Sequence, residues 1–88
     1  MKLQSGFVVR EVAGKTVAIS TSPKNSFQGM ISLNASAKLL WQKLTLGAER
    51  EELVAALMEE YGIDRSLAER DTDALVATLR QHGLLVEQ

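Results

Sequence analysis

Residues 28–41, which read QGMISLNASAKLLW, contain the change of period that decides the fold. Ile31 and Leu33 alternate with their neighbours, which is the two-residue period of a strand with one face toward a core. Between residues 37 and 44 the apolar side chains instead recur at the i, i+3, i+4, i+7 spacing of a helix. Asn34 stands at the junction, where its side-chain oxygen can accept a hydrogen bond from the first helical turn. The stretch therefore predicts a strand that passes directly into a helix.

The predicted strand also carries a functional signal, since it contains no charged residue and no proline. Proteins usually protect a sheet edge with such residues, because exposed N–H and C=O groups invite another chain to pair. If this strand is an edge, it is either covered internally or kept for a partner. Its candidate binding residues are Gly29, Met30, Ile31, Ser32 and Leu33.

Two further β-rich runs, residues 7–12 and 16–20, flank Ala13-Gly14-Lys15 and predict a hairpin. The side chains expected to share one face of this hairpin are Phe7, Val9, Val17 and Ile19. Arg10 is expected on the other face.

The hairpin is followed by a turn-rich segment, residues 21–26, which contains the single proline of the chain and ends the second strand. Phe27 is expected to anchor this loop. A sequential antiparallel meander is the simplest topology, and it places residues 29–33 at an edge of the sheet.

Three helices are predicted after the strands. The first covers residues 35–46. The second, residues 49–61, opens with acids where the helix dipole favours them and ends before Gly62. The third runs from a cap at Asp64 to about His82, and an apolar tail at residues 84–86 folds back. The fold class is therefore α+β, with a three-stranded antiparallel sheet followed by three helices in a winged helix-turn-helix arrangement.

The third helix has a core stripe and, beside it, a flank of mostly short side chains. The residues of this flank are Leu67, Asp71, Ala74 and Thr78. Short side chains beside a core stripe can leave a groove, whereas a solvated flank more often carries Lys or Glu. The flank is thus a candidate binding surface, and an ordinary helix boundary is the alternative.

Length and composition narrow the class of protein. The 88 residues fit one domain over residues 1–88, and the absence of cysteine removes disulfides, thiolate metal sites and cysteine nucleophiles. No apolar run reaches the roughly 20 residues that span a bilayer, and the N-terminus lacks a signal-peptide pattern. We therefore expect a soluble, cytoplasmic protein with no membrane segment, metal or cofactor.

The net charge of −1 conceals an asymmetry between the two halves of the chain. Residues 1–48 contain six cations against one acid, whereas residues 49–88 contain four cations against ten acids. Two interpretations stay open: the halves favour docking on each other, or the basic sheet offers a face to an acidic peptide.

Several residues, taken in order, resemble the PqqD family. They are Phe27, Gly29, Ile31, Leu33, Asn34, Trp41, Glu51-Glu52-Leu53, Tyr61-Gly62-Ile63-Asp64, Asp71, Leu79 and Gly83-Leu84-Leu85. Each motif alone marks a turn, a cap or a core position and is not specific to one family. The resemblance therefore depends on the order and spacing of the motifs. It covers nearly the whole chain.

PqqD-like proteins are RiPP recognition elements, small peptide chaperones that bind the leader of a ribosomally synthesised precursor peptide. The resemblance implies that the leader adds to the third predicted strand, in a cleft closed by the third helix, which agrees with the unprotected edge. It also implies a modifying enzyme of peptide natural product biosynthesis as partner, most often a radical SAM maturase. A cyclase or a protease is the alternative.

Two other classes of function fit the sequence less well. For an enzyme, the sole histidine, His82, falls in the last turn of the third helix, where a positive charge is locally favourable. For a winged helix DNA-binding regulator, the third helix should be basic, yet residues 64–82 contain four acids and three arginines. We therefore expect a protein that is not an enzyme and binds no nucleic acid. A weak homodimer through the free edge stays open.

Overall fold

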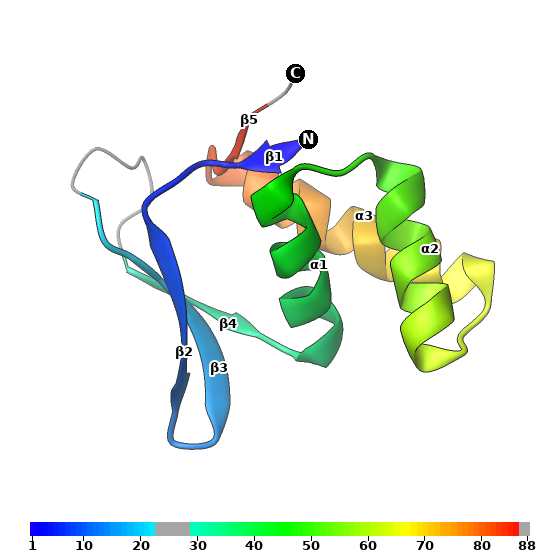
Figure 1. Ribbon diagram of the computed structural model, residues 1–88, viewed down its shortest axis with the longest axis horizontal. Coiled ribbons are helices and arrows are strands. Elements are labelled where there is room, and N and C mark those ends of the chain that lie inside the picture. The colour runs from blue at the N-terminus through cyan, green and yellow to red at the C-terminus, as the bar shows by residue number, and fades with distance from the viewer. Residues whose placement is uncertain (23–28, 87–88) are drawn as a thin grey trace.

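The computed structural model describes residues 1–22 and 29–86, and they form a three-stranded antiparallel sheet, three helices and two short terminal strands (Figure 1). In chain order the elements are β1 (Lys2–Leu3), β2 (Phe7–Val12), β3 (Lys15–Ser20), β4 (Met30–Leu33), α1 (Ala35–Leu46), α2 (Arg50–Tyr61), α3 (Arg65–Gln81) and β5 (Leu85–Val86). The predicted α+β class is confirmed, and the layout is consistent with a winged helix-turn-helix. The role expected of Phe27 falls outside the described residues.

The β2–β3 hairpin turns over Ala13 and Gly14, which have φ angles of 52° and 79°. Positive φ at both central residues is what a type I′ turn requires. Because the turn takes two residues rather than three, the register is Val12–Lys15, Arg10–Val17, Val9–Ala18, Val8–Ile19 and Phe7–Ser20. Val17 and Ile19 therefore lie on the face opposite to Phe7, which corrects the sequence prediction.

One face of the sheet packs against the helices. Side chains that lie directly opposite each other on neighbouring strands point to the same side, so Phe7, Ala18 and Ile31 belong to one face. The ring of Phe7 meets that of Trp41 on α1 edge to face, with centroids 5.6 Å apart. Leu33 is also buried. Ile31 and Leu33 thus face the core, as their alternation predicts.

The predicted caps are confirmed at the start of α1, the end of α2 and the start of α3. The Asn34 side chain accepts a hydrogen bond from the amide of Ala37 at 2.8 Å, and Asp64 accepts one from the amide of Leu67 at 2.9 Å. Gly62 adopts the left-handed conformation (φ 62°) directly after α2, where a side chain would be strained. The strand-to-helix switch and the α2–α3 corner are therefore both specified locally.

The apolar stripes of the three helices meet in one core. Its buried helical residues are Leu40, Trp41, Leu44, Leu53, Val54, Leu57, Ala68, Val76 and Leu79. Thr72 is fully buried among them, and its hydroxyl has no hydrogen-bond partner among the described residues. Across α2 and α3, the Arg50 guanidinium donates two hydrogen bonds to the Asp73 carboxylate, at 2.8 and 2.9 Å.

The apolar tail pairs with the N-terminus, which the sequence did not predict. β1 and β5 form a two-stranded antiparallel sheet in which Lys2 lies opposite Val86 and Leu3 opposite Leu85. Leu3 and Leu84 are buried, so this small sheet closes the core at the end of α3. Among the described helices, none is long and apolar enough to cross a membrane.

Candidate functional site

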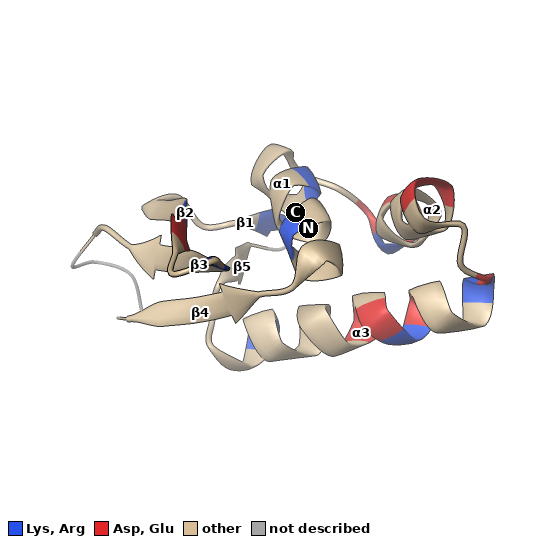
Figure 2. Cartoon of the chain, turned by 90° about the horizontal axis from the view of Figure 1, so that it is seen from below, with Lys and Arg blue, Asp and Glu red and all other residues tan. Residues whose placement is uncertain are grey.

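β4 is an edge strand, because the order of the sheet is β2, β3, β4. Figure 2 shows β4 as the strand of this sheet nearest to α3, with β3 and β2 beyond it. The strand reads MISL, so neither a charge nor a proline blocks pairing along it. The prediction of an unprotected edge is confirmed, with the strand beginning at Met30 rather than Gly29.

The hydrogen bonding between β3 and β4 fixes which backbone groups of β4 face outward. The Ser20 amide donates to the Gly29 carbonyl oxygen, with N and O 3.2 Å apart. In an antiparallel pair, alternate residues direct both N–H and C=O toward the partner strand. In the observed register, Ile31 and Leu33 follow the phase of Gly29 and point toward β3.

Met30 and Ser32 are in the opposite phase, so their N–H and C=O groups point to the open side of the sheet. The hairpin supports this assignment independently. Its two-residue turn closes on the Val12–Lys15 pair, so the odd-numbered residues of β3 bond to β2 and the even-numbered ones bond to β4. The edge therefore offers two donors and two acceptors to an added strand.

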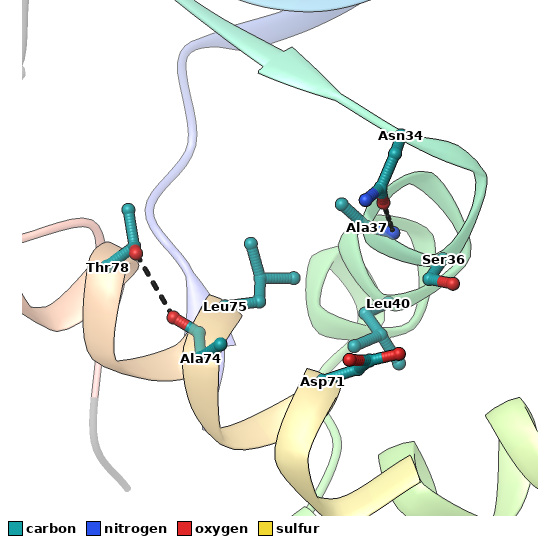
Figure 3. Close-up of a pocket in the computed structure, with 8 residues that line it drawn as sticks. All are labelled: Asn34, Ser36, Ala37, Leu40, Asp71, Ala74, Leu75 and Thr78. Atoms are coloured by element: carbon teal, nitrogen blue, oxygen red, sulfur yellow. Dashed lines mark hydrogen bonds between the residues drawn. The ribbon is translucent and has the colours of Figure 1, made fainter. Parts of the chain in front are cut away.

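A pocket of about 260 Å³ lies between the start of α1 and the flank of α3 (Figure 3). It is lined by Asn34, Ser36, Ala37, Leu40, Asp71, Ala74, Leu75 and Thr78. Its walls combine the apolar side chains Ala37, Leu40, Ala74 and Leu75 with four polar ones. Leu75 points from α3 into the pocket. The pocket is smaller than the roughly 300–1,000 Å³ of typical small-molecule sites, so it suits one or two side chains better than a cofactor.

Some polar groups of the pocket already form hydrogen bonds within the protein. The Thr78 hydroxyl donates to the Ala74 carbonyl oxygen at 3.0 Å, and the Asn34 oxygen caps α1 (Figure 3). The Asp71 carboxylate is only 35% exposed and lies 3.7 Å from Nε of Arg70. Asp71 therefore gives one side of the pocket a negative charge and an acceptor.

The predicted site residues fall into three groups. Asp71, Ala74 and Thr78 line the pocket together. Residues 29–33 form the adjacent edge rather than the lining. Leu67 is part of neither, because it lies one turn nearer the start of α3, where it is half-buried and its amide is held by the Asp64 cap.

Sequence reasoning missed the other wall of the pocket, which comes from α1. Ser36 and Ala37 are small residues in the first turn of α1, and Leu40 follows one turn later. Leu75 of α3 is only partly buried and also lines the pocket. The run Ala35-Ser36-Ala37 was the available signal, because small residues directly after an edge strand leave room beside it.

A basic hollow of about 590 Å³ lies at the end of β4. Its lining consists of Gly14, Lys15, Thr16, Ser32, Leu33, Asn34, Ala35 and Lys38. Lys38 is 3.6 Å from the Glu11 carboxylate. Arg10 lies elsewhere, on β2, and so is separated from the open edge by β3 and β4. Lys15 and Lys38 therefore place two cations at the end of β4.

Charges of both signs lie along α3 (Figure 2). Several of them form ion pairs within the protein. Arg65 lies 3.1 Å from Glu51 and 3.7 Å from Glu69, and Arg50 is held by Asp73. A recognition helix for DNA needs cations that are available to phosphates and base edges. The geometry therefore disfavours the DNA-binding alternative.

Comparisons with known proteins identify one family and two similar solved structures. A family model described as coenzyme PQQ synthesis protein D (PqqD) matches residues 14–85. The chain is similar to TbiB1 in complex with the TbiA(beta) leader peptide, with 26% identity, a TM-score of 0.75, and coverage of 100% of this chain and 98% of that one. It is also similar to lasso peptide synthetase B1 complexed with the leader peptide, with 27% identity, a TM-score of 0.72, and coverage of 98% and 96%. No curated protein matches it.

Proposed function

This chain belongs to the PqqD family, and we propose that it binds the leader segment of a ribosomally synthesised precursor peptide by strand addition to β4. The observation that carries the proposal is the open edge beside the pocket. Met30 and Ser32 supply outward backbone groups, and α3 supplies a pocket on the side of the helices. The two solved relatives, each in complex with a leader peptide, support the same class of ligand.

The energetics require both parts of the site. Four hydrogen bonds to Met30 and Ser32 contribute about 2–6 kcal/mol, at about 0.5–1.5 kcal/mol each. Micromolar affinity needs about 8 kcal/mol, and ordering a disordered leader costs more. Burying one apolar side chain adds about 1.5–3 kcal/mol. The leader therefore places at least one apolar side chain in the pocket between α1 and α3.

We assign the chemistry of maturation to a partner enzyme and only binding and presentation to this chain. Asp71 is the single titratable group among the lining residues, whereas His82 lies at the end of α3, outside the lining. On the basis of the family, we propose a radical SAM maturase as the partner enzyme, with a cyclase or a protease as the alternative. The proposed location of both proteins is the cytoplasm. Residues 1–88 are proposed to act as one binding domain without a cofactor.

A titration tests the proposal directly. The neighbouring genes are searched for a short open reading frame that encodes a precursor peptide. Its synthetic leader is added to isotope-labelled protein while amide signals are followed. Signals of residues 29–33 and of the α3 flank from Asp71 to Thr78 should shift, with a dissociation constant in the micromolar range or below. Shifts confined to α2 would contradict the assignment, and so would the absence of any shift.

A further inference from the structure

The face of the sheet that points away from the helices is largely apolar. The register places Val8, Ile19 and Met30 in one row across the three strands, and Arg10, Val17 and Ser32 in the next. Val17 is buried, yet it is not part of the core that the helices share. Met30, at the open end of its row, is 64% exposed. This row, the Met30 row, therefore ends in an uncovered apolar side chain at the edge where we place the leader.

Strand geometry determines where the side chains of an added peptide go. A peptide residue opposite Met30 points to the same face as Met30, with its Cβ about 4.5–5.5 Å from that of Met30. The next residue, opposite Ile31, points to the other face, where the pocket lies. This alternation holds for parallel and antiparallel addition alike, because opposite residues share a face in both.

Given the proposed leader binding, we infer that Met30 forms a second subsite, which takes an aliphatic or aromatic side chain of the leader on the outer face of the sheet. That side chain extends the Met30 row to a fourth strand. Met30 suits the role because its unbranched thioether adapts to different apolar partners. The leader is thus recognised on both faces of the sheet: one residue covers Met30, and a residue an odd number of positions away enters the pocket.

The test uses a displayed library of random peptides about twelve residues long. Such peptides are longer than β4, which has 4 residues, so they can pair along its whole length. The library is selected against the wild type, Met30→Thr and Val12→Thr. Val12 is the matched control, because it is an exposed apolar residue of the same face (49% exposed) but lies on β2, away from the edge. Thr keeps a strand-forming side chain at both positions.

The wild type and Val12→Thr should enrich peptides with apolar residues at two positions that are an odd number of residues apart. Met30→Thr should lose the preference at one of these positions and bind a wild-type-selected peptide up to about fivefold more weakly, the effect of losing one cross-strand apolar pair. A double-mutant cycle adds a second readout: alanine at that peptide position should weaken binding to the wild type but not to Met30→Thr.

Two outcomes would overturn the inference, and they differ in what they say of leader binding. If Met30→Thr selects the same motif and binds the selected peptide as tightly as the wild type, the outer subsite does not exist while strand addition stands. If the wild type enriches no peptide, peptide binding itself fails and the subsite fails with it.

Discussion

The amide of Ser20 donates to the carbonyl oxygen of Gly29 across 3.2 Å, and this bond sets the phase of the whole β3–β4 pair. Because of it, Ile31 is held by β3 and Met30 and Ser32 face outward. A bond one residue further along would reverse the assignment and turn the outward groups inward. The direction of the backbone groups is therefore known for each residue of β4. The role of this edge in binding can be tested with single substitutions.

Proline substitution should separate binding from folding along β4. Ser32→Pro removes an outward N–H and places a ring where the leader would lie, so the domain should stay folded while leader affinity falls at least about tenfold. Ile31→Pro removes a bond to β3 and should destabilise the fold itself. Circular dichroism checks folding, and calorimetric titration checks affinity.

Val9→Pro is the matched control for Ser32→Pro. Val9 has the same outward phase, but on β2, at the opposite edge of the sheet. Its variant should fold and bind the leader as the wild type does. Equal loss of affinity in both variants would mean that the leader does not distinguish the two edges.

The basic hollow at the end of β4 predicts salt-dependent binding of an acidic leader. Lys15→Glu should weaken binding roughly two- to fivefold at low salt, and added salt should reduce the difference. Arg10→Glu should have a smaller effect, because Arg10 lies about 14 Å, or three strand spacings, from an added strand. If the affinity changes neither with salt nor with Lys15→Glu, electrostatic attraction does not contribute to recognition. The apolar contacts would then account for binding alone.

Thr72 carries a buried hydroxyl without a partner among the described residues. Replacing it with the nearly isosteric valine should raise the free energy of unfolding by about 1 kcal/mol, since the desolvated hydroxyl is removed. Thr78→Val is the control, because the Thr78 hydroxyl is bonded to Ala74 and its side chain is exposed. Urea denaturation measures both. A Thr72→Val variant no more stable than the wild type would contradict this account of the core.

The link between α2 and α3 should respond to acid. The Arg50 guanidinium donates to Asp73 and holds the pKa of that carboxyl below its ordinary value of 3.8. The ionised pair therefore stabilises the fold above that value, and its contribution is lost as the pH falls through the lower folded-state pKa. Asp73→Asn should melt slightly below the wild type at neutral pH, with the gap closing as the pH falls below 3.8 and through the lower folded-state pKa.

Glu59→Gln is the control for this pH dependence. Glu59 is an exposed carboxylate of α2 without an ion pair to another described residue. Its melting temperature should follow that of the wild type at every pH. A gap for Asp73→Asn that persists unchanged in acid would show that Asp73 acts through something other than its charge.

Much of the fold could be predicted because its decisive signals are local. The change of period before Ala37, the caps at Asn34 and Asp64, and the left-handed Gly62 each depend on a few neighbouring residues. The edge position of β4 followed from the meander. These features needed no knowledge of distant contacts.

The rest depends on contacts that no local pattern encodes. Ala13 adopts a positive φ that is uncommon for its residue type, so the hairpin register was wrong by one residue. β1 and β5 are two residues each and pair across nearly the full chain. Likewise, Ser36 and Leu75 become pocket walls only because α1 packs against α3. The sequence therefore predicted the α3 wall of the pocket but not the α1 wall.

Hydrogen exchange of the four β4 amides tests the central claim most directly, because it needs no substitution. In the free domain, Ile31 and Leu33 should be protected by β3, whereas Met30 and Ser32 should exchange rapidly. Saturation with the leader should slow exchange at Met30 and Ser32 by about tenfold or more and change Ile31 and Leu33 much less. A bound leader that leaves the exchange of Met30 and Ser32 unchanged would contradict strand addition at this edge.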